Sequence, residues 1–153
     1  MLVTSCDEPT AVSAAETSAV FPAAFATQYT ELRDCRHSHE HELNHIRVLV
    51  NDLAKEPYAR LSAEVPYPVG AILVKAEYDD DACTMLVGYT AMRKEPAGYA
   101  PDSGDWRWQK LDTTLKVLED GSPQTCIHCH EHHCAPAGAV TALGYDLTCA
   151  EEL

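Results

Sequence analysis

Basic residues are scarce in this chain: its 153 residues include 11 Lys and Arg against 24 Asp and Glu, which gives a net charge of −13. Nucleic acids and anionic membrane surfaces bind clustered positive charge, so this balance argues against both as partners. The chain also lacks an internal repeat, a low-complexity tract and any apolar run near the roughly 20 residues that a transmembrane helix needs. What is present is a composition typical of one globular domain, with 46% hydrophobic and 23% charged residues.

Cysteine and histidine, by contrast, are abundant, with seven Cys and eight His. Seven cysteines are many for a protein of the reducing cytosol and few for a fold held only by disulfides. An odd number also means that simple pairing cannot use every thiol. At least one cysteine therefore has another role.

The first residues suggest export. Val3-Thr4-Ser5-Cys6 resembles the lipobox of bacterial lipoproteins, in which the cysteine receives a lipid anchor; a chance match in a tether is the alternative. The stretch from Ala11 to Thr30 has no basic flank and does not fit a secretory signal. We expect residues 1–14 to be the tether of an exported protein, anchored through Cys6 at a periplasmic or outer surface. An oxidising compartment of this kind permits disulfides.

The rest of the chain, residues 15–153, predicts a single α+β domain. Hydrophobic periodicity favours a mostly antiparallel sheet of about four to five strands, with flanking helices and a C-terminal helix in a Cys/His-rich segment. Helices are expected over Thr17–Cys35, from Asn51-Asp52 to Leu61 and from Cys126 onward. Strands are expected at His45–Val50, Val69–Tyr78, Cys83–Met92, Trp106–Asp112 and Leu115–Leu118, with a loop over Ala97–Asp105. Trp106 and Trp108 alternate on one strand, which favours core positions over a place in a dimer interface.

The strongest motif is Cys126-Ile127-His128-Cys129-His130, the Cys-x-x-Cys-His attachment signature of c-type haem. Two thiols one helical turn apart can each add to a vinyl group on the same porphyrin edge, and His130 then becomes the proximal ligand of the iron. A tetrahedral zinc site is a second reading, because further metal-binding side chains are near: His128, His132, His133 and Cys134. A redox Cys-x-x-Cys pair is a third reading, although such pairs normally follow a strand of a βαβ unit, which the pattern does not predict.

A second cluster is rich in histidine and runs from Cys35 to His45, with His37, His39 and His41 between them. Its simplest interpretation is a solvated turn. Several imidazoles close together also bind divalent ions readily, so an accessory metal site or a proton relay is the alternative. Nothing in the spacing selects a metal.

The cysteine count becomes even once two thiols are assigned to haem and Cys6 to lipid. The remaining four are Cys35, Cys83, Cys134 and Cys149, which allow three pairings. We favour Cys35 with Cys83 and Cys134 with Cys149. Free buried thiols that pack as small hydrophobes are the alternative.

In order and spacing, several short segments resemble cytochrome P-460 over roughly Ile46 to His130. They are His45-Ile46-Arg47-Val48, Val69-Gly70-Ala71-Ile72-Leu73-Val74-Lys75, Gly88-Tyr89, Gly104-Asp105-Trp106 and the Cys-x-x-Cys-His motif. The resemblance implies an antiparallel β fold with flanking helices, a homodimer and one c-type haem. In that family a strand lysine is cross-linked to the haem, and hydroxylamine is oxidised to nitrous oxide or nitric oxide. The sister group, cytochrome c′-beta, resembles the same fold without the cross-link and binds diatomic gases.

By this resemblance, Lys75 matches the cross-linking lysine and Arg47 matches an arginine of the distal pocket. Lys75 is in phase with Ala71 and Leu73, so a desolvated, nucleophilic amine is one reading and a strand-end lysine reaching water is the other. Arg47 is either directed at a pocket or exposed to solvent. Where the family can place a distal glutamate, this chain has Arg93, which cannot act as a base; Glu95, two residues further on, is a substitute.

The sequence thus predicts an exported mono-haem oxidoreductase that oxidises hydroxylamine or a similar small nitrogen compound. His130 would hold the iron, Lys75 would be bonded to the macrocycle, and Arg47 and Arg93 would line an open distal side. The alternatives are an uncross-linked binder of nitric oxide or another diatomic gas, and an electron-transfer cytochrome with Met85 or Met92 as sixth ligand. The negative charge suits a basic redox partner.

Overall fold

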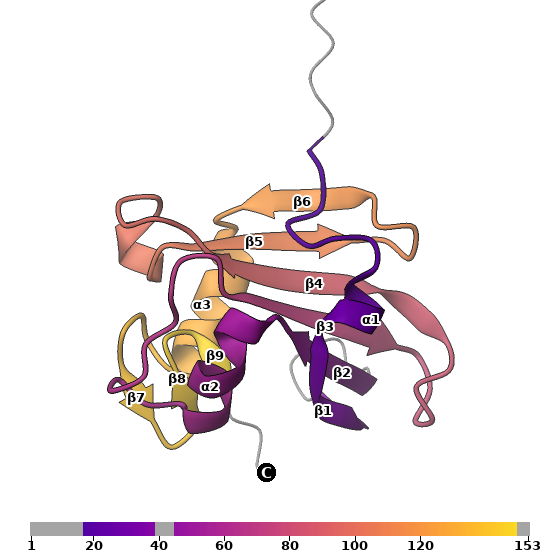
Figure 1. Ribbon diagram of the computed structural model, residues 1–153, viewed down its shortest axis with the longest axis horizontal. Helices are drawn as coiled ribbons and strands as arrows, with labels where there is room; N and C mark the ends of the chain where they lie inside the picture. Colours follow the sequence, from indigo (N-terminus) through magenta and orange to yellow (C-terminus); the bar gives the residue numbers. More distant parts are fainter. Residues whose placement is uncertain (1–16, 39–44, 150–153) are drawn as a thin grey trace, which may run out of the picture.

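The computed structural model describes residues 17–38 and 45–149, which form an α+β fold dominated by one antiparallel sheet (Figure 1). Six strands form this sheet in the order β1-β2-β3-β4-β5-β6, so each strand pairs with the next one in the chain. They are β1 (Thr30–His37), β2 (His45–Val50), β3 (Ile72–Tyr78), β4 (Leu86–Lys94), β5 (Trp106–Leu111) and β6 (Val117–Gly121). A second, small sheet joins β7 (Val140–Thr141), β8 (Gly144–Tyr145) and β9 (Thr148–Cys149).

Three α-helices and one short 3-10 helix accompany the strands within the described ranges. They are α1 (Phe25–Gln28), α2 (Asp52–Arg60), α3 (Gln124–His133) and the 3-10 helix Pro101–Ser103. None of these described helices is long and apolar enough to cross a membrane. The predicted α+β class with a mostly antiparallel sheet is confirmed, with one strand more in the main sheet than the upper end of the expected range.

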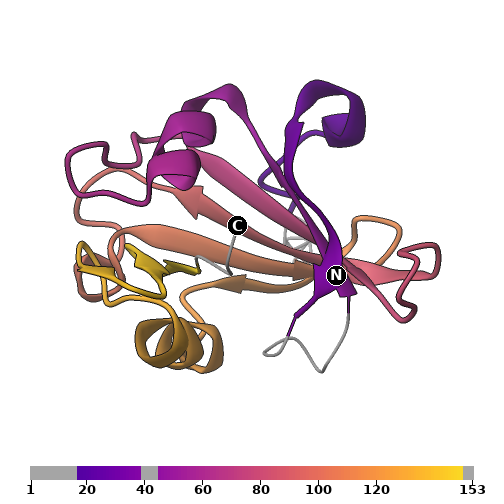
Figure 2. The same ribbon diagram turned by 90° about the horizontal axis from the view of Figure 1, so that it is seen from below.

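Side chains alternate between the two faces of the large sheet, and both faces are buried. One face, which we call the cavity face, packs with α2 and α3 and presents Val48, Leu73, Met92 and Trp108. The opposite face packs against the segment before β1 and presents Leu49, Ile72, Val74, Ala91 and Leu111 against Val20, Phe21 and Phe25. Figure 2 shows the consequence, with α1 and α3 on opposite sides of the sheet. Trp106 and Trp108 are both buried, so the core positions expected for them are confirmed.

The helix α2 begins where Asn51 connects it to the sheet. The Asn51 Oδ1 accepts hydrogen bonds from the Ala54 amide at 3.2 Å and from the Ile72 amide at 3.0 Å, and its Nδ2 donates to the Gly70 carbonyl at 2.8 Å. One side chain therefore caps the helix and fixes it to the start of β3. The helix expected from Asn51-Asp52 to Leu61 is confirmed.

The leading helix expected over Thr17–Cys35 is wrong. Only Phe25–Gln28 is helical, and the chain from Thr30 onward is strand β1, paired antiparallel with β2. The apolar side chains that suggest helical spacing, Phe21 and Phe25, do pack together, with ring centroids 4.8 Å apart, but in a compact turn. Pairing with β2 satisfies the backbone groups after Tyr29, so tertiary contacts override local periodicity.

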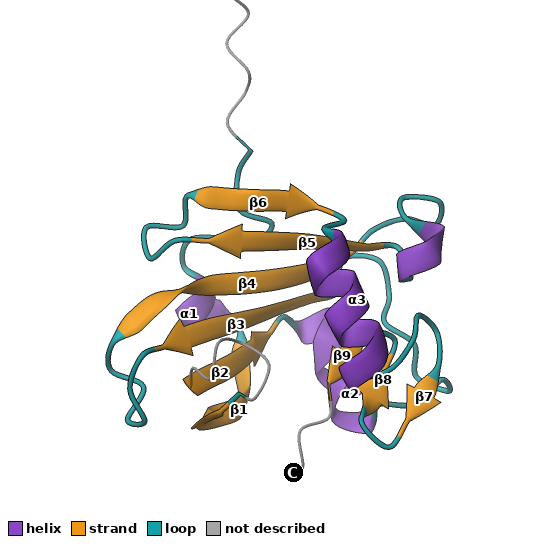
Figure 3. Ribbon diagram, turned by 180° about the vertical axis from the view of Figure 1, so that it is seen from behind, coloured by secondary structure: helices purple, strands orange, loops and turns teal. Residues whose placement is uncertain are grey.

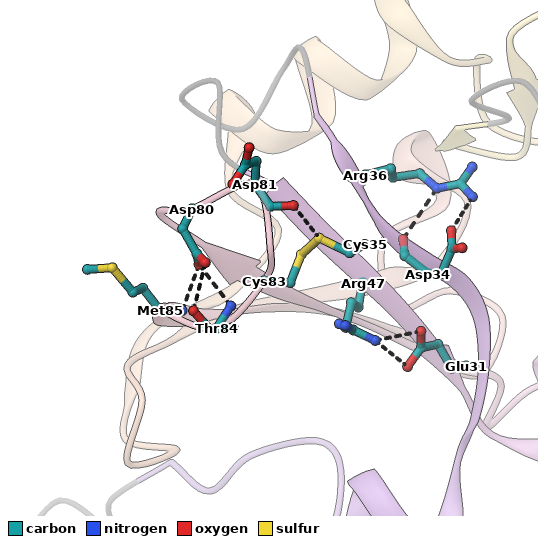
Figure 4. Close-up of a disulfide and its surroundings, with 10 residues drawn as sticks. All are labelled: Glu31, Asp34, Cys35, Arg36, Arg47, Asp80, Asp81, Cys83, Thr84 and Met85. Carbon is teal, nitrogen blue, oxygen red and sulfur yellow. Dashed lines mark hydrogen bonds and ion pairs between the residues drawn. A yellow bond between two sulfur atoms is a disulfide. The ribbon is translucent and has the colours of Figure 1, made fainter.

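Both predicted disulfides are confirmed. Cys35–Cys83 joins β1 to the loop before β4 with a Cα–Cα distance of 5.8 Å, and Cys134–Cys149 joins the end of α3 to β9 at 4.6 Å. The strand expected at Cys83–Met92 starts only at Leu86, because Asp80 accepts hydrogen bonds from the Thr84 and Met85 amides and holds a turn there (Figure 4).

Candidate functional site

A cavity of about 330 Å³ lies on the cavity face of the sheet, beneath α3. Figure 3 shows α3 crossing this side of the sheet, with β9 beside it. Strands β2 to β6 all contribute to the wall, through residues that include Val48, Leu73, Met92, Trp108 and Glu119. The volume is at the lower end of the range for ligand cavities, and the wall combines apolar side chains with a few polar ones.

Helix α3 brings the Cys-x-x-Cys-His motif to this wall. Cys126, Cys129 and His130 all line the cavity, and the helix expected from Cys126 onward is confirmed as α3. The two cysteines are half-buried thiols, whereas the other four described cysteines form disulfides. Burial raises the pKa of the Cys126 thiol, and the nearby carboxylate of Glu119 raises it further. The Cys126 thiol is therefore held in its protonated form.

His130 is buried, and its ring orientation is fixed from two sides. Its Nδ1 lies 2.6 Å from the Leu147 carbonyl oxygen, and its ring meets the Trp108 ring edge-on at 4.7 Å between centroids. A carbonyl can only accept, so Nδ1 carries the proton and Nε2 carries the lone pair in the neutral ring. An Nδ1–H bond to a backbone carbonyl is the usual outer contact of a metal-binding histidine, so His130 is suited to bind a metal through Nε2.

Strand β3 places two charged side chains in the same cavity. Lys75 and Glu77 both line it, and they share the cavity face because they are two residues apart. Glu77 is buried, with 9% of its surface exposed, and its Oε1 accepts a hydrogen bond from the Thr90 hydroxyl at 3.0 Å. The sequence reasoning missed Glu77. Its phase with Lys75 in the predicted strand was the signal that could have found it.

Two buried polar atoms have no hydrogen-bond partner in the described part of the chain, and both belong to this side of the sheet. They are Nε1 of Trp108, which lines the cavity, and Nε of Arg33 on β1. A buried donor without an acceptor destabilises a protein, so such atoms point to a bound group. The indole N–H of Trp108 can donate to a ligand of the cavity.

The structure does not bring Arg47, Arg93 or Glu95 to the cavity, contrary to the distal positions expected for them. Arg47 alternates with the cavity-face residue Val48, and on the opposite face it binds Glu31 at 3.0 Å (Figure 4). Its ion pair with Glu31 is partly exposed to solvent.

Arg93 pairs in register with Ile72, which packs on the opposite face as well, and the Arg93 Nε donates to Glu95 at 2.7 Å. The period of two along a strand explains these positions, because it places Arg47 and Arg93 out of phase with the cavity-face residues.

The other readings of the Cys/His-rich segment receive less support from the geometry. His128, His132 and His133 are exposed, and Cys134 is in a disulfide and so is not a thiolate ligand. His130, Cys134 and Cys149 do bring potential metal-ligand atoms within 4.8 Å of one another, but the two cysteines are bonded to each other. Cys126-x-x-Cys129 follows an antiparallel strand and not a parallel βαβ unit.

The two methionines considered as sixth ligands differ in position. Met85 is 60% exposed, whereas Met92 is buried in the cavity wall. In the second histidine cluster, His37 and His45 face each other across β1 and β2 with ring centroids 5.4 Å apart. His39 and His41 lie outside the described residues, as do Cys6 and the predicted tether.

The comparison with known proteins leaves the cavity to be interpreted from its own geometry. No protein-family model matches the chain, and no curated protein matches it in sequence.

Proposed function

We propose that this protein is an exported mono-haem c-type cytochrome that oxidises hydroxylamine or a similar small nitrogen compound, as cytochrome P-460 does. One observation carries the proposal. Lys75 and the Cys126-x-x-Cys129-His130 motif are some 50 residues apart in the chain, yet both line one cavity. These are the groups that the resemblance assigns to the cross-link and to haem attachment.

The chemistry of the wall fits a haem c. Cys126 and Cys129 would each add a thiol S–H across a vinyl group, forming a thioether without net oxidation. His130 would bind the iron through Nε2, since its Nδ1 proton already binds the Leu147 carbonyl. The unpartnered indole N–H of Trp108 supports a bound group on this face.

Two residues of β3 would act on the bound group and the substrate. The Lys75 amine is placed for the cross-link, in which an N–C bond replaces an N–H and a meso C–H bond. An oxidant such as peroxide would accept the two electrons and two protons released. The buried carboxylate of Glu77 is a proton acceptor in the cavity wall, with the Thr90 hydroxyl orienting it. When bound, the haem iron supplies a Lewis acid and an electron acceptor for the substrate.

The location and partners follow from the same proposal. Two disulfides are compatible with an extracytoplasmic location, where c-type haem is attached. A lipid anchor at Cys6, a homodimer and a basic redox partner remain part of the proposal, the last because of the charge of −13.

The test is the state of the haem in the protein purified after export with c-type maturation. We expect a haem-stained band on a denaturing gel that disappears in the Cys126→Ala/Cys129→Ala variant. Peptide mass spectrometry is expected to find the Lys75 peptide covalently linked to the haem peptide. The Lys75→Met variant should keep the haem stain and lose that cross-link. An unstained wild-type band would overturn the proposal, and a stained band with an unmodified Lys75 peptide would reduce it to an uncross-linked gas binder.

The position of Met92 favours a second candidate, an electron-transfer cytochrome. Met92 is buried in the cavity wall, where its thioether can approach a bound iron. A ferric spectrum with a methionine–iron charge-transfer band, lost in Met92→Leu, would support this function. A five-coordinate ferric spectrum in the wild-type protein would exclude it.

A further inference from the structure

Arg33 on β1 is a buried cation without a counter-charge among the described residues. Only 3% of its surface is exposed, its Nε has no hydrogen-bond partner, and it forms no ion pair with any residue that the structure describes. The guanidinium carbon lies 5.3 Å from the centroid of the Tyr58 ring. A cation over an aromatic face gains a modest attraction, which does not replace the hydration of a full charge.

The position of Arg33 relates it to the cavity. Arg33 pairs in register with Val48 on β2, and both Val48 and Tyr58 line the cavity. The thiols of Cys126 and Cys129 approach the cavity from α3, which follows β6 at the other edge of the sheet. The cavity therefore extends from the thiols toward the β1 edge of the sheet, where Arg33 is buried.

The chemistry of haem c suggests what Arg33 binds. The two vinyl-derived carbons that form thioethers lie on one side of the porphyrin, and its two carboxylates lie on the other. A group held at Cys126 and Cys129 thus presents carboxylates away from these thiols. A guanidinium matches a carboxylate with two parallel N–H···O bonds, and a buried one needs such a partner.

We propose that Arg33 binds a propionate carboxylate of the haem, an inference that rests on the proposed function. Arg33 is not itself among the residues that line the cavity, but its guanidinium lies over the ring of Tyr58, which does line it. The ion pair has two consequences. It removes the penalty of a buried unpaired charge when haem binds, and it neutralises the negative charge of the propionate near the macrocycle, which favours the reduced state of the iron.

The experiment compares Arg33→Met with Arg60→Met, a control that removes the same charge from an exposed site on α2. In protein exported without the haem-maturation machinery, Arg33→Met is expected to raise the melting temperature, because an unpaired buried charge is gone. In the haem-loaded protein, this gain is expected to vanish or reverse, and the midpoint potential is expected to fall. The Arg60→Met variant should show neither the haem-dependent change in melting temperature nor the fall in potential.

The outcomes separate the two proposals. Wild-type protein without covalent haem overturns the proposed function, and this inference with it. Haem-loaded wild-type protein leaves the proposed function standing. If its Arg33→Met variant then changes the melting temperature equally with and without haem, or keeps the wild-type midpoint potential, the role of Arg33 is overturned alone.

Discussion

In the proposed oxidation of hydroxylamine, Glu77 is the residue on which turnover should depend most directly, because its buried carboxylate lines the cavity beside Lys75. Glu77→Gln keeps the size of the side chain and an acceptor for the Thr90 hydroxyl, but removes the base. Loss of a general base typically lowers a rate by about 10² to 10⁴. We expect a fall of that order in kcat for hydroxylamine oxidation with an artificial electron acceptor, at unchanged haem content. Glu56→Gln, on the exposed side of α2, is the control, and equal rates for both variants would remove Glu77 from the mechanism.

Cys126 gives a second prediction at this scale, through the raised pKa of its thiol. Burial raises that pKa, and the Glu119 carboxylate adds to the effect. The thiolate is the nucleophile, so a raised pKa lowers the fraction of Cys126 that can react at a given pH. In haem-free Cys129→Ala protein we expect iodoacetamide to label Cys126 more slowly than after unfolding, and faster as pH rises. Glu119→Gln should increase the labelling rate at neutral pH; equal rates before and after unfolding would contradict this.

Much of the site could be predicted from short motifs and single residues. What the sequence does not show is which face of a strand points into the cavity. Cys126, Cys129 and His130 are close in sequence, so their spacing alone predicts that they act together. Lys75 was singled out by the family resemblance, and its phase with Leu73 agreed with a place on the same face. Arg47 was left between two readings, because alternation gives its parity but not which face holds a cavity. Packing between distant elements decides that, and it is not a local property.

At the scale of elements, β1 shows why part of the fold could not be predicted. The segment Thr17–Cys35 has the apolar spacing of a helix, yet β1 forms because β2 offers a paired edge and Cys83 a disulfide partner. Both partners are distant in sequence. The burial of Arg33 could not be predicted for the same reason, since a strand and a helix direct that side chain differently.

The Cys35–Cys83 disulfide should account for a large share of the stability of this edge of the sheet. It closes a sequence separation of 48 residues and ties β1 to the loop before β4. A disulfide of this kind typically stabilises by roughly 2–4 kcal/mol, chiefly by limiting the unfolded chain. Cys35→Ser/Cys83→Ser is therefore expected to lower the free energy of unfolding in urea by that amount. The haem spectrum should not change, because the disulfide lies outside the cavity wall, and an unaltered unfolding midpoint would refute the prediction.

Strand β6 is held to β5 by Asp120, which makes its attachment sensitive to acid. The Arg107 guanidinium binds Asp120 with two bonds of 2.8 Å and lowers the pKa of that carboxyl, and Gln109 donates a further bond. A lowered folded-state pKa adds stability above the ordinary value of about 3.9, which is lost as pH falls through the folded-state pKa.

Asp120→Asn should thus lower the melting temperature at neutral pH, by the equivalent of about 1 kcal/mol, and flatten its decline below about pH 4. Calorimetry across that range is the measurement. Asp102→Asn, an exposed carboxylate in the 3-10 helix, serves as the control. If the melting temperatures of wild type and Asp120→Asn changed in parallel with pH, the stabilising role of the Arg107–Asp120 ion pair would be contradicted.

At the scale of the whole molecule, the two faces of one sheet have different roles. The segment before β1 closes one face by packing the rings of Phe21 and Phe25 against the ring of Tyr89 on β4. The other face keeps a cavity beneath α3, and the disulfide Cys134–Cys149 and the bond between His130 and the Leu147 carbonyl tie α3 to the segment that follows it. The cluster on the opposite face is a core that, apart from Ala91, does not line the cavity, whereas Val48, Leu73, Met92 and Trp108 belong both to a core cluster and to the cavity wall.

Under the proposed function, the charge of the whole molecule predicts how the haem-loaded protein associates with an electron acceptor. A net charge of −13 attracts a basic protein over a distance set by the Debye length, about 10 Å at 0.1 M salt. The rate of electron transfer from the reduced protein to a cationic acceptor is therefore expected to fall steeply as ionic strength rises. Under the same conditions a neutral acceptor should react at a nearly constant rate and an anionic one should react faster. Stopped-flow kinetics with the three acceptors measures this, and an equal response to salt in all three would show that steering by charge does not select the redox partner.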